Sequence, residues 1–207
     1  MSNPKRIVIV GGVAGGMSTA TRMRRLDEQA HITVIEKSGH VSYANCGLPY
    51  FVGGVIENEA DLLLQTPERL FARFRIEVKV DTEVVGIDAA AHSVTVRHGH
   101  DGSESTIEFD KLVLSPGALP VRPPIPGFDR VRVLRTVEDA NRLWGDVSAA
   151  PASAVVIGAG IAAGFAYWAV AGWSAGFWKP VFAPPSPPQL PPQSQSEALP
   201  RPPAAQA

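Results

Sequence analysis

Short apolar runs, separated by glycine-rich or polar segments, recur through the first 150 residues of this 207-residue chain. The first run, residues 7–10, is too short for a helix and is typical of a buried strand in a parallel sheet. A glycine-rich turn follows it. Beyond the turn, the next apolar residues are spaced for the inward face of a helix: Met17, Ala20, Met23 and Leu26. The opening therefore predicts a strand, a tight turn and a helix.

The later pattern alternates between strands and helices. Residues 32–36 predict a second strand, and residues 62–74 predict a helix with Thr66 as N-cap and Pro67 at the first helical position. Further strands are expected at residues 76–80, 82–87, 92–98, 106–109 and 110–114, and a last helix, capped by Thr136, at residues 136–144. The third and fourth of these strands indicate a hairpin. The order of elements predicts an α/β fold.

The turn after the first strand is a variant of a dinucleotide-binding loop. It reads Gly11-Gly12-Val13-Ala14-Gly15-Gly16, so Val13 replaces the middle glycine of the G-x-G-x-x-G pattern. Glycine permits a tight turn and the close approach of a pyrophosphate, which the N–H groups of a helix N-terminus can bind. Glu36 ends the second strand 25 residues after Gly11, where an acid that binds a ribose is expected. The alternative is an ordinary glycine-rich turn with a surface glutamate, but the elements occur in the order that a nucleotide site requires.

Composition changes sharply near residue 150. Of the 19 basic and 20 acidic residues, all but three precede residue 151, and the net charge of −1 argues against nucleic acid as a partner. Only four apolar residues follow Lys5 and Arg6 before the glycine turn, so we expect no signal peptide, and the single cysteine fits a cytoplasmic protein. From residue 180 to the end, 10 of 28 residues are proline, which predicts a disordered low-complexity tail.

A second glycine loop begins where the charged residues end. Residues 154–157 repeat the opening apolar run, and Gly158 and Gly160 follow it, but no acid ends a second strand afterwards. The chain is thus divided into a dinucleotide-binding domain and two further segments: residues 1–150, the truncated start of a second dinucleotide-binding unit at 151–163, and an apolar and then proline-rich tail at 164–207.

A membrane anchor is the alternative interpretation of part of this segment. Residues 151–178 carry no charge and are long enough to cross a bilayer. Glycine, alanine and serine dilute their hydrophobicity, and the strand and loop explain the segment better. We therefore expect no membrane partner.

Cys46 is the candidate for redox chemistry. The chain holds no second cysteine, so a catalytic Cys46 would have to pass through a sulfenic acid, a persulfide or a mixed disulfide with a small thiol. A buried, structural thiol is the alternative. The residues alone leave both open, and the nucleotide loop favours the redox role. The histidines His92, His98 and His100 lack the spacing of metal ligands and are expected at the surface, so no metal site is predicted.

Two segments together resemble a known family. The glycine loop with its helix, and the motif Ser42-Tyr43-Ala44-Asn45-Cys46-Gly47-Leu48-Pro49-Tyr50, resemble the pyridine nucleotide–disulfide oxidoreductases. Within that family the single-cysteine branch is most similar, above all its coenzyme A disulfide reductases, with NADH oxidases and persulfide reductases near them. The resemblance covers residues 5 to about 160. It implies a Rossmann-like, FAD/NAD(P)-binding three-layer ββα domain with a β-meander.

The resemblance also implies a role for particular residues. FAD would lie along the first glycine loop, with Glu36 on the adenosine ribose, Lys37 beside it and the turn Ser115-Pro116-Gly117 near the cofactor. Cys46 would sit against the flavin and form a mixed disulfide with coenzyme A, while NAD(P)H supplies electrons. The family positions that contact coenzyme A match Ser18, Arg22, Arg25, Ser42 and Asn45, whereas Arg24 is expected on a solvated helix face. A further basic position of the family falls at Phe74, where Arg73 or Arg75 would have to substitute.

The chain departs from the family after about residue 163. The family continues with a complete NAD(P)H domain, a second FAD segment and a domain through which it forms homodimers. Their absence here suggests a frameshifted or truncated reading frame and predicts that the chain alone is weak or inactive. Two alternatives to a disulfide reductase stay open: an NADH oxidase-type flavoprotein that uses a cysteine sulfenic acid, and a non-catalytic nucleotide-binding remnant.

Overall fold

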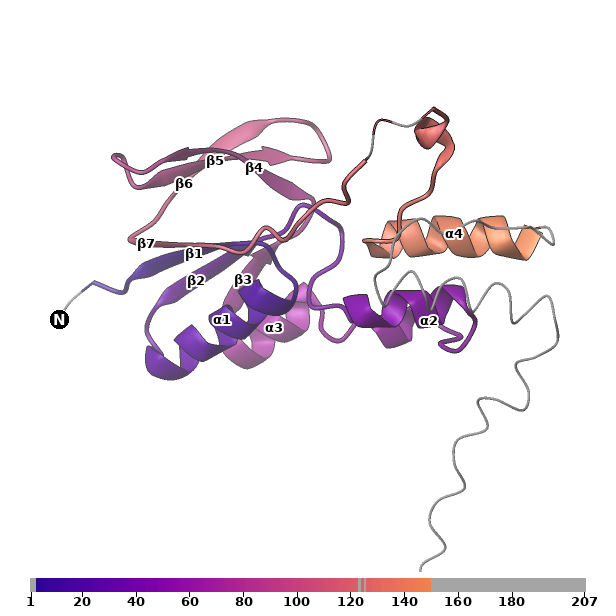
Figure 1. Cartoon of the computed structure of the whole chain (residues 1–207). Helices are drawn as coiled ribbons and strands as arrows, with labels where there is room; N and C mark the ends of the chain where they lie inside the picture. The colour runs from indigo at the N-terminus through magenta and orange to yellow at the C-terminus, as the bar shows by residue number, and fades with distance from the viewer. Residues whose placement is uncertain (1–2, 123, 125, 150–207) are drawn as a thin grey trace, which may run out of the picture.

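A four-stranded parallel sheet forms the centre of the structure, a computed structural model that describes residues 3–122, 124 and 126–149 (Figure 1). Its strands follow the order β3-β2-β1-β7 and comprise β1 (Arg6–Val10), β2 (His31–Ile35), β3 (Ile76–Lys79) and β7 (Lys111–Leu114). All three pairings are parallel, with Ile9 opposite Val34 and Val113. Strands β1, β2 and β7 are short and apolar, as the sequence predicts.

The sheet is covered on both faces, which makes the domain three layers thick (Figure 1). The helices α1 (Ala14–Leu26) and α3 (Pro67–Phe74) pack on one face, where Ile7 and Ile9 meet Met17, Ala20 and Leu70. The other face packs on an antiparallel sheet of β4 (Thr82–Asp88), β5 (Ser93–His98) and β6 (Glu104–Glu108), where Val8 and Ile35 meet Val94 and Val96. Alternate residues of β1 therefore serve opposite layers. The expected three-layer Rossmann-like α/β fold with a β-meander is confirmed.

A separate apolar cluster lies beside the sheet, between α2 (Leu48–Val52) and α4 (Val137–Ala149). The rings of Phe51 and Trp144 lie 5.9 Å apart at its centre, and Val137 and Ala140 are fully buried. Three short 3-10 turns complete the described elements: η1 (Asn45–Gly47), η2 (Glu59–Leu62) and η3 (Phe128–Arg130).

Two predicted helix boundaries need correction. The helix expected at residues 62–74 begins only at Pro67, because the residue before a proline is extended, and Thr66 caps it as predicted by accepting the N–H of Arg69. Leu62 instead ends η2 in the α2–α4 cluster. The last helix runs on past residue 144, to Ala149.

Two predicted exposures are also wrong, and both concern α1. Its inward face runs through Met17, Ala20 and Arg24, so Leu26 lies on another side of the helix and is exposed. Arg24 is buried, not solvated: its guanidinium donates to the carbonyls of Phe74 (2.7 Å), Arg75, Asp27, Glu28 and Ala30. Burial, and then the charge of Arg75, lower the pKa of Arg24. The side chain ties the end of α1 to the end of α3.

Several predictions fall outside the described residues, among them Gly158, Gly160, the second dinucleotide-binding unit and the proline-rich tail. Within the described part of the chain, none of the helices is both long and apolar enough to cross a membrane. The same part contains no group of histidine, cysteine and acidic side chains that could hold a metal ion.

Candidate functional site

The glycine loop joins β1 to α1 and fits tightly against its surroundings. Gly11 has a φ of +101°, in the region that favours glycine, and its N–H donates to the Ile35 carbonyl at 2.8 Å. A Cβ on Gly11 would overlap the Ser115 carbonyl, and one on Gly16 would overlap the Gly11 carbonyl. The loop therefore needs glycine at both positions. Val13, in place of the middle glycine, is half-buried and packs on the α2–α4 cluster.

The N-terminus of α1 is open to a ligand. Val13 at the N-cap makes no side-chain capping hydrogen bond, and the first turn holds no acidic residue. The first backbone hydrogen bond of the helix is from Met17 to Val13, so the N–H groups of residues 13–16 have no acceptor within the described residues. Free N–H groups and the positive end of the helix dipole favour an anion here.

Glu36 is positioned by the loop it supports. One carboxylate oxygen accepts the N–H of Gly12 at 2.6 Å, and the other accepts the N–H and the hydroxyl of Ser38, both at 2.9 Å. A carboxylate offers about four acceptor sites, so one remains on the oxygen that faces Gly12. Glu36 is thus a fixed acceptor with capacity for one further donor.

These segments surround a cavity of about 580 Å³, which we call the loop cavity. Its lining includes most of the residues expected to hold a dinucleotide: Gly11, Val13, Ala14, Gly15, Glu36, Lys37, Ser115, Pro116 and Gly117. Gly12 and Gly16 are buried behind this lining. The segments converge because β1 and β7 are parallel neighbours, so the turns at their carboxyl ends meet, and the Ser115 N–H donates to the Val10 carbonyl at 2.8 Å.

Cys46 lies in η1, directly before α2, and its side chain is exposed. The alternative of a buried structural thiol is therefore wrong. Cys46 lines a second cavity of about 290 Å³, which we call the cysteine cavity, together with Asn45, Leu48, Pro49, Leu134 and Arg135. Asn45 and Arg135 line the loop cavity as well. The two cavities therefore adjoin.

The residues expected to contact coenzyme A fall into two groups. Ser18, Arg22 and Arg25 are exposed along one face of α1, at the i, i+4 and i+7 positions, but they line neither cavity. Ser42 is attached to the glycine loop, because its N–H donates to the Gly12 carbonyl at 2.8 Å, and Asn45 lines both cavities.

Both arginines that could substitute at the Phe74 position have contacts of their own. Phe74 is half-buried against the core, and the Arg73 guanidinium lies 5.1 Å from the centre of its ring. Arg75 is the left-handed C-cap of α3, and its guanidinium donates to the Glu28 carbonyl at 3.4 Å.

Sequence reasoning missed several residues of the cavity walls, above all Tyr43, Arg135 and Glu138. Tyr43 is 6 % exposed, and burial raises the pKa of its phenol, while the charge of Arg135 opposes the shift. Arg135 donates from Nε to the Ala118 carbonyl at 3.0 Å. Arg135 lines the cysteine cavity although it lies about 90 residues after Cys46, and no spacing in the sequence indicates this or the place of Glu138 in the loop cavity.

Comparison with known proteins places this geometry in context. A family model described as pyridine nucleotide-disulphide oxidoreductase matches residues 5–170. The coenzyme A disulfide reductase of Staphylococcus haemolyticus is 38% identical over 159 residues, which cover 75% of this chain and 36% of that protein.

Two solved structures extend the comparison. The NAD-dependent persulfide reductase of A. fulgidus is 33% identical with a TM-score of 0.77, over 82% of this chain and 32% of that one. The water-forming NADH oxidase of Lactobacillus brevis, bound to NADH, is 27% identical with a TM-score of 0.76, over 82% and 38%. The chain spans about a third of the length of the curated relatives it matches.

Proposed function

The chain belongs to the pyridine nucleotide-disulphide oxidoreductase family, and we propose that its described part supplies the FAD site and the reactive cysteine of a reductase for coenzyme A disulfide or a related disulfide. Members of this family are FAD-dependent and take electrons from NAD(P)H. One observation carries the proposal: the two cavities adjoin, because Asn45 and Arg135 line both of them. An exposed thiol lies next to a cavity whose walls suit a dinucleotide.

The residues of the loop cavity fit FAD. The free N–H groups at the start of α1 suit its pyrophosphate, and the remaining acceptor site of Glu36 suits a ribose hydroxyl. Lys37, whose ammonium pairs with Glu83 at 2.7 Å, lies beside Glu36 in the cavity wall. The turn Ser115-Pro116-Gly117 forms another part of the wall. A flavin bound there and reduced by NAD(P)H would supply the electron pair for reduction.

Cys46 performs the exchange step in this proposal. Its thiolate attacks one sulfur of the disulfide, the disulfide bond breaks, and the leaving thiolate takes a proton from solvent. The product is a mixed disulfide on Cys46 Sγ. Two electrons and a proton then release the second thiol and restore the Cys46 thiolate. Asn45, next to Cys46 in both cavities, is placed to orient the substrate.

The arginine face of α1 supports a phosphorylated disulfide as substrate. Arg22 and Arg25 are exposed, and the structure gives their guanidinium groups no carboxylate partner among the described residues. Arginine binds phosphate through parallel N–H donors. Coenzyme A carries phosphates, and the coenzyme A disulfide reductase of S. haemolyticus is among the relatives.

A second candidate is oxygen or peroxide chemistry through a sulfenic acid on Cys46. It is supported by the exposure of a thiol with no second cysteine in the chain, and by the fold shared with the NADH oxidase. The two candidates differ in the state of Cys46 after oxidation, namely a mixed disulfide or a sulfenic acid.

The exchange step is tested by intact-mass spectrometry of the full chain after exposure to coenzyme A disulfide. We expect one coenzyme A per chain, and none on Cys46→Ser. In a double variant, Arg22→Ala with Arg25→Ala, adduct formation with coenzyme A disulfide should slow about tenfold, whereas the rate with the uncharged hydroxyethyl disulfide should not change.

Three outcomes would overturn the proposal in favour of an alternative. A sulfenic acid trapped by dimedone after peroxide, with no coenzyme A adduct, supports the oxidase. An adduct that persists in Cys46→Ser, or no modification of either kind, indicates a non-catalytic nucleotide-binding protein. FAD binding is measured separately by equilibrium dialysis, and Glu36→Gln should weaken it about tenfold, because a charge-assisted acceptor is lost.

A further inference from the structure

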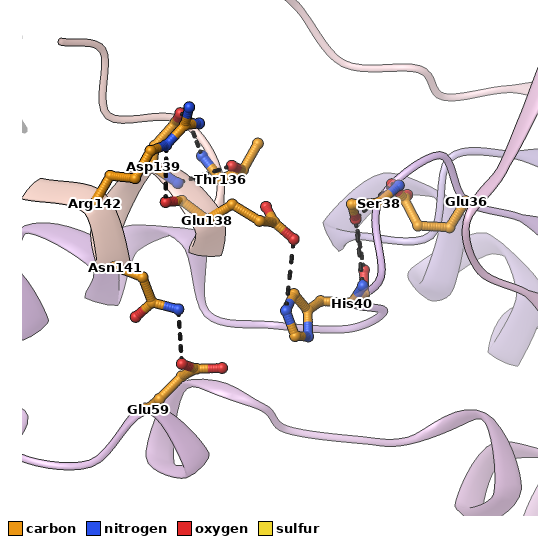
Figure 2. A network of polar contacts seen from close by, with 9 residues as sticks. All are labelled: Glu36, Ser38, His40, Glu59, Thr136, Glu138, Asp139, Asn141 and Arg142. Atoms are coloured by element: carbon orange, nitrogen blue, oxygen red, sulfur yellow. Dashed lines mark hydrogen bonds and ion pairs between the residues drawn. The ribbon is translucent and has the colours of Figure 1, made fainter. Parts of the chain in front are cut away.

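A chain of polar contacts runs from the glycine loop to the start of α4. Figure 2 shows its part from Glu36 to Glu138. Gly12 donates to Glu36, and Ser38 donates to the other oxygen of Glu36. The Ser38 hydroxyl also lies 3.0 Å from the His40 carbonyl. The His40 ring in turn points at Glu138, with 3.5 Å between Nε2 and Oε1. The contacts therefore cross from one wall of the loop cavity to another.

The far end of this chain belongs to a helix that shapes both cavities. Glu138 lies in the first turn of α4 and lines the loop cavity with Thr136, while Arg135, just before the helix, lines both cavities. Polar contacts join α4 to the segment between β2 and α3, among them His40 with Glu138, and Asn141 with Glu59 at 2.7 Å (Figure 2). They lie beside the apolar packing of α4 on α2.

We propose that His40 and Glu138 are positioning residues. Their contact, which we call the clasp, holds the start of α4 against residues 36–40 and so keeps the wall of the loop cavity in place. The inference rests on the proposed function in taking FAD as the ligand of this cavity. The His40 side chain is 26 % exposed and the Glu138 side chain is 47 % exposed, so the pair is partly shielded from water.

Other charged groups around His40 leave Glu138 as its partner. Glu36 already accepts three donors, and Lys37 is paired with Glu83. The Asp81 carboxylate lies beside Gly39, and both residues line the loop cavity. On α4, Asp139 is occupied by Arg142 and by the N–H groups of Arg135 and Thr136. Among the described residues His40 is the ion-pair partner of the Glu138 carboxylate, which faces the histidine (Figure 2).

Hydrogen exchange of the full chain, without ligand, tests the clasp itself. Amides in the first turns of α4 should exchange about two- to fivefold faster in His40→Gln than in the parent chain. His40→Lys, which keeps a cation opposite Glu138, should retain most of the protection. Asp146→Asn, which removes the separate pair of α4 with Arg132, is the matched control and should leave these amides unchanged. Equal exchange in His40→Gln and the parent chain, or an equal loss of protection in Asp146→Asn, overturns the clasp.

FAD affinity connects the clasp to the cavity. The dissociation constant from equilibrium dialysis should be about two- to fivefold higher in His40→Gln than in the parent chain, and unchanged in Asp146→Asn. If the parent chain binds no FAD but hydrogen exchange still follows the prediction, the proposed function is refuted and the clasp is supported. FAD binding of equal affinity in the parent chain and in His40→Gln refutes the clasp and leaves the proposed function standing.

Discussion

Two regions of the molecule meet at the cavities, and they are fixed in different ways. The loop region, residues 7–36, is held by backbone: parallel pairing of β1 with β2, a positive φ at Gly11, and glycines too close to their neighbours to bear a Cβ. The cysteine region, residues 43–52 with α4, is held by side chains, chiefly the packing of Phe51 on Trp144. The strand, turn and helix of the first region are local in sequence, although the Ser115 turn packs against Gly11, whereas the second region joins segments about 90 residues apart.

This difference determines which substitutions destabilise each part of the site. The loop region fails when atoms are added, because its backbone segments are in contact already. The cysteine region fails when atoms are removed, because apolar packing, including Phe51 on Trp144, joins α4 to α2. Substitutions that add or remove atoms therefore separate the two.

The largest effect is expected from removing the anchor of the cysteine region. Phe51→Ala should cost about 4 kcal/mol of unfolding free energy, because a nearly buried ring leaves a cavity against Trp144. Urea unfolding measures the loss, and hydrogen exchange should place it in α2 and α4. Phe71→Ala on α3 is the control, since that ring is 61 % exposed, and should cost well under about 1 kcal/mol. Equal losses in the two variants would show that the cluster does not hold the region.

The next effect is expected from adding one methyl group to the loop region. Gly16→Ala should cost about 3 kcal/mol, because the new Cβ overlaps the Gly11 carbonyl and moves backbone on the cavity wall. Urea midpoints measure it. Gly145→Ala in α4 is matched, as nothing lies within 4 Å of its Cβ position, and should be neutral or stabilise by up to about 1 kcal/mol. A Gly16→Ala chain as stable as the parent contradicts the tight packing described for the loop.

The smallest effect concerns Tyr43, which lines the loop cavity and packs in the cysteine region. Burial raises the pKa of its phenol. The neutral phenol therefore contributes stability that is fully present below about pH 10, the ordinary value, and is lost as pH rises further. Between pH 9.5 and 11, the parent chain should lose up to about 1 kcal/mol more than Tyr43→Phe, as measured by urea unfolding at each pH. Identical losses would argue that Tyr43 is hydrated.

The contrast between local and tertiary contacts also explains which features can be predicted from the sequence. The strand, glycine turn and helix at residues 7–26 are recognisable, because periodicity and turn chemistry depend on neighbouring residues. The helix over residues 67–74 is recognisable from its Thr66 cap and Pro67. Arg24 is wrongly predicted as solvated, because its five carbonyl partners include the far end of α3. Arg135 and Glu138 escape notice for the same reason, since their contacts are tertiary. Exposure of Cys46 also depends on packing that no local pattern encodes.

The central claim is that the cavity of Cys46 adjoins the cavity for FAD. The rate at which iodoacetamide alkylates Cys46, the single cysteine, tests it directly when measured with and without FAD at a concentration that dialysis shows to be saturating. Glutathione alkylated under the same conditions controls for loss of reagent. The account predicts that bound FAD slows the alkylation of Cys46 at least about fivefold, because access through the shared wall at Asn45 and Arg135 is reduced. An unchanged rate with FAD bound would contradict it.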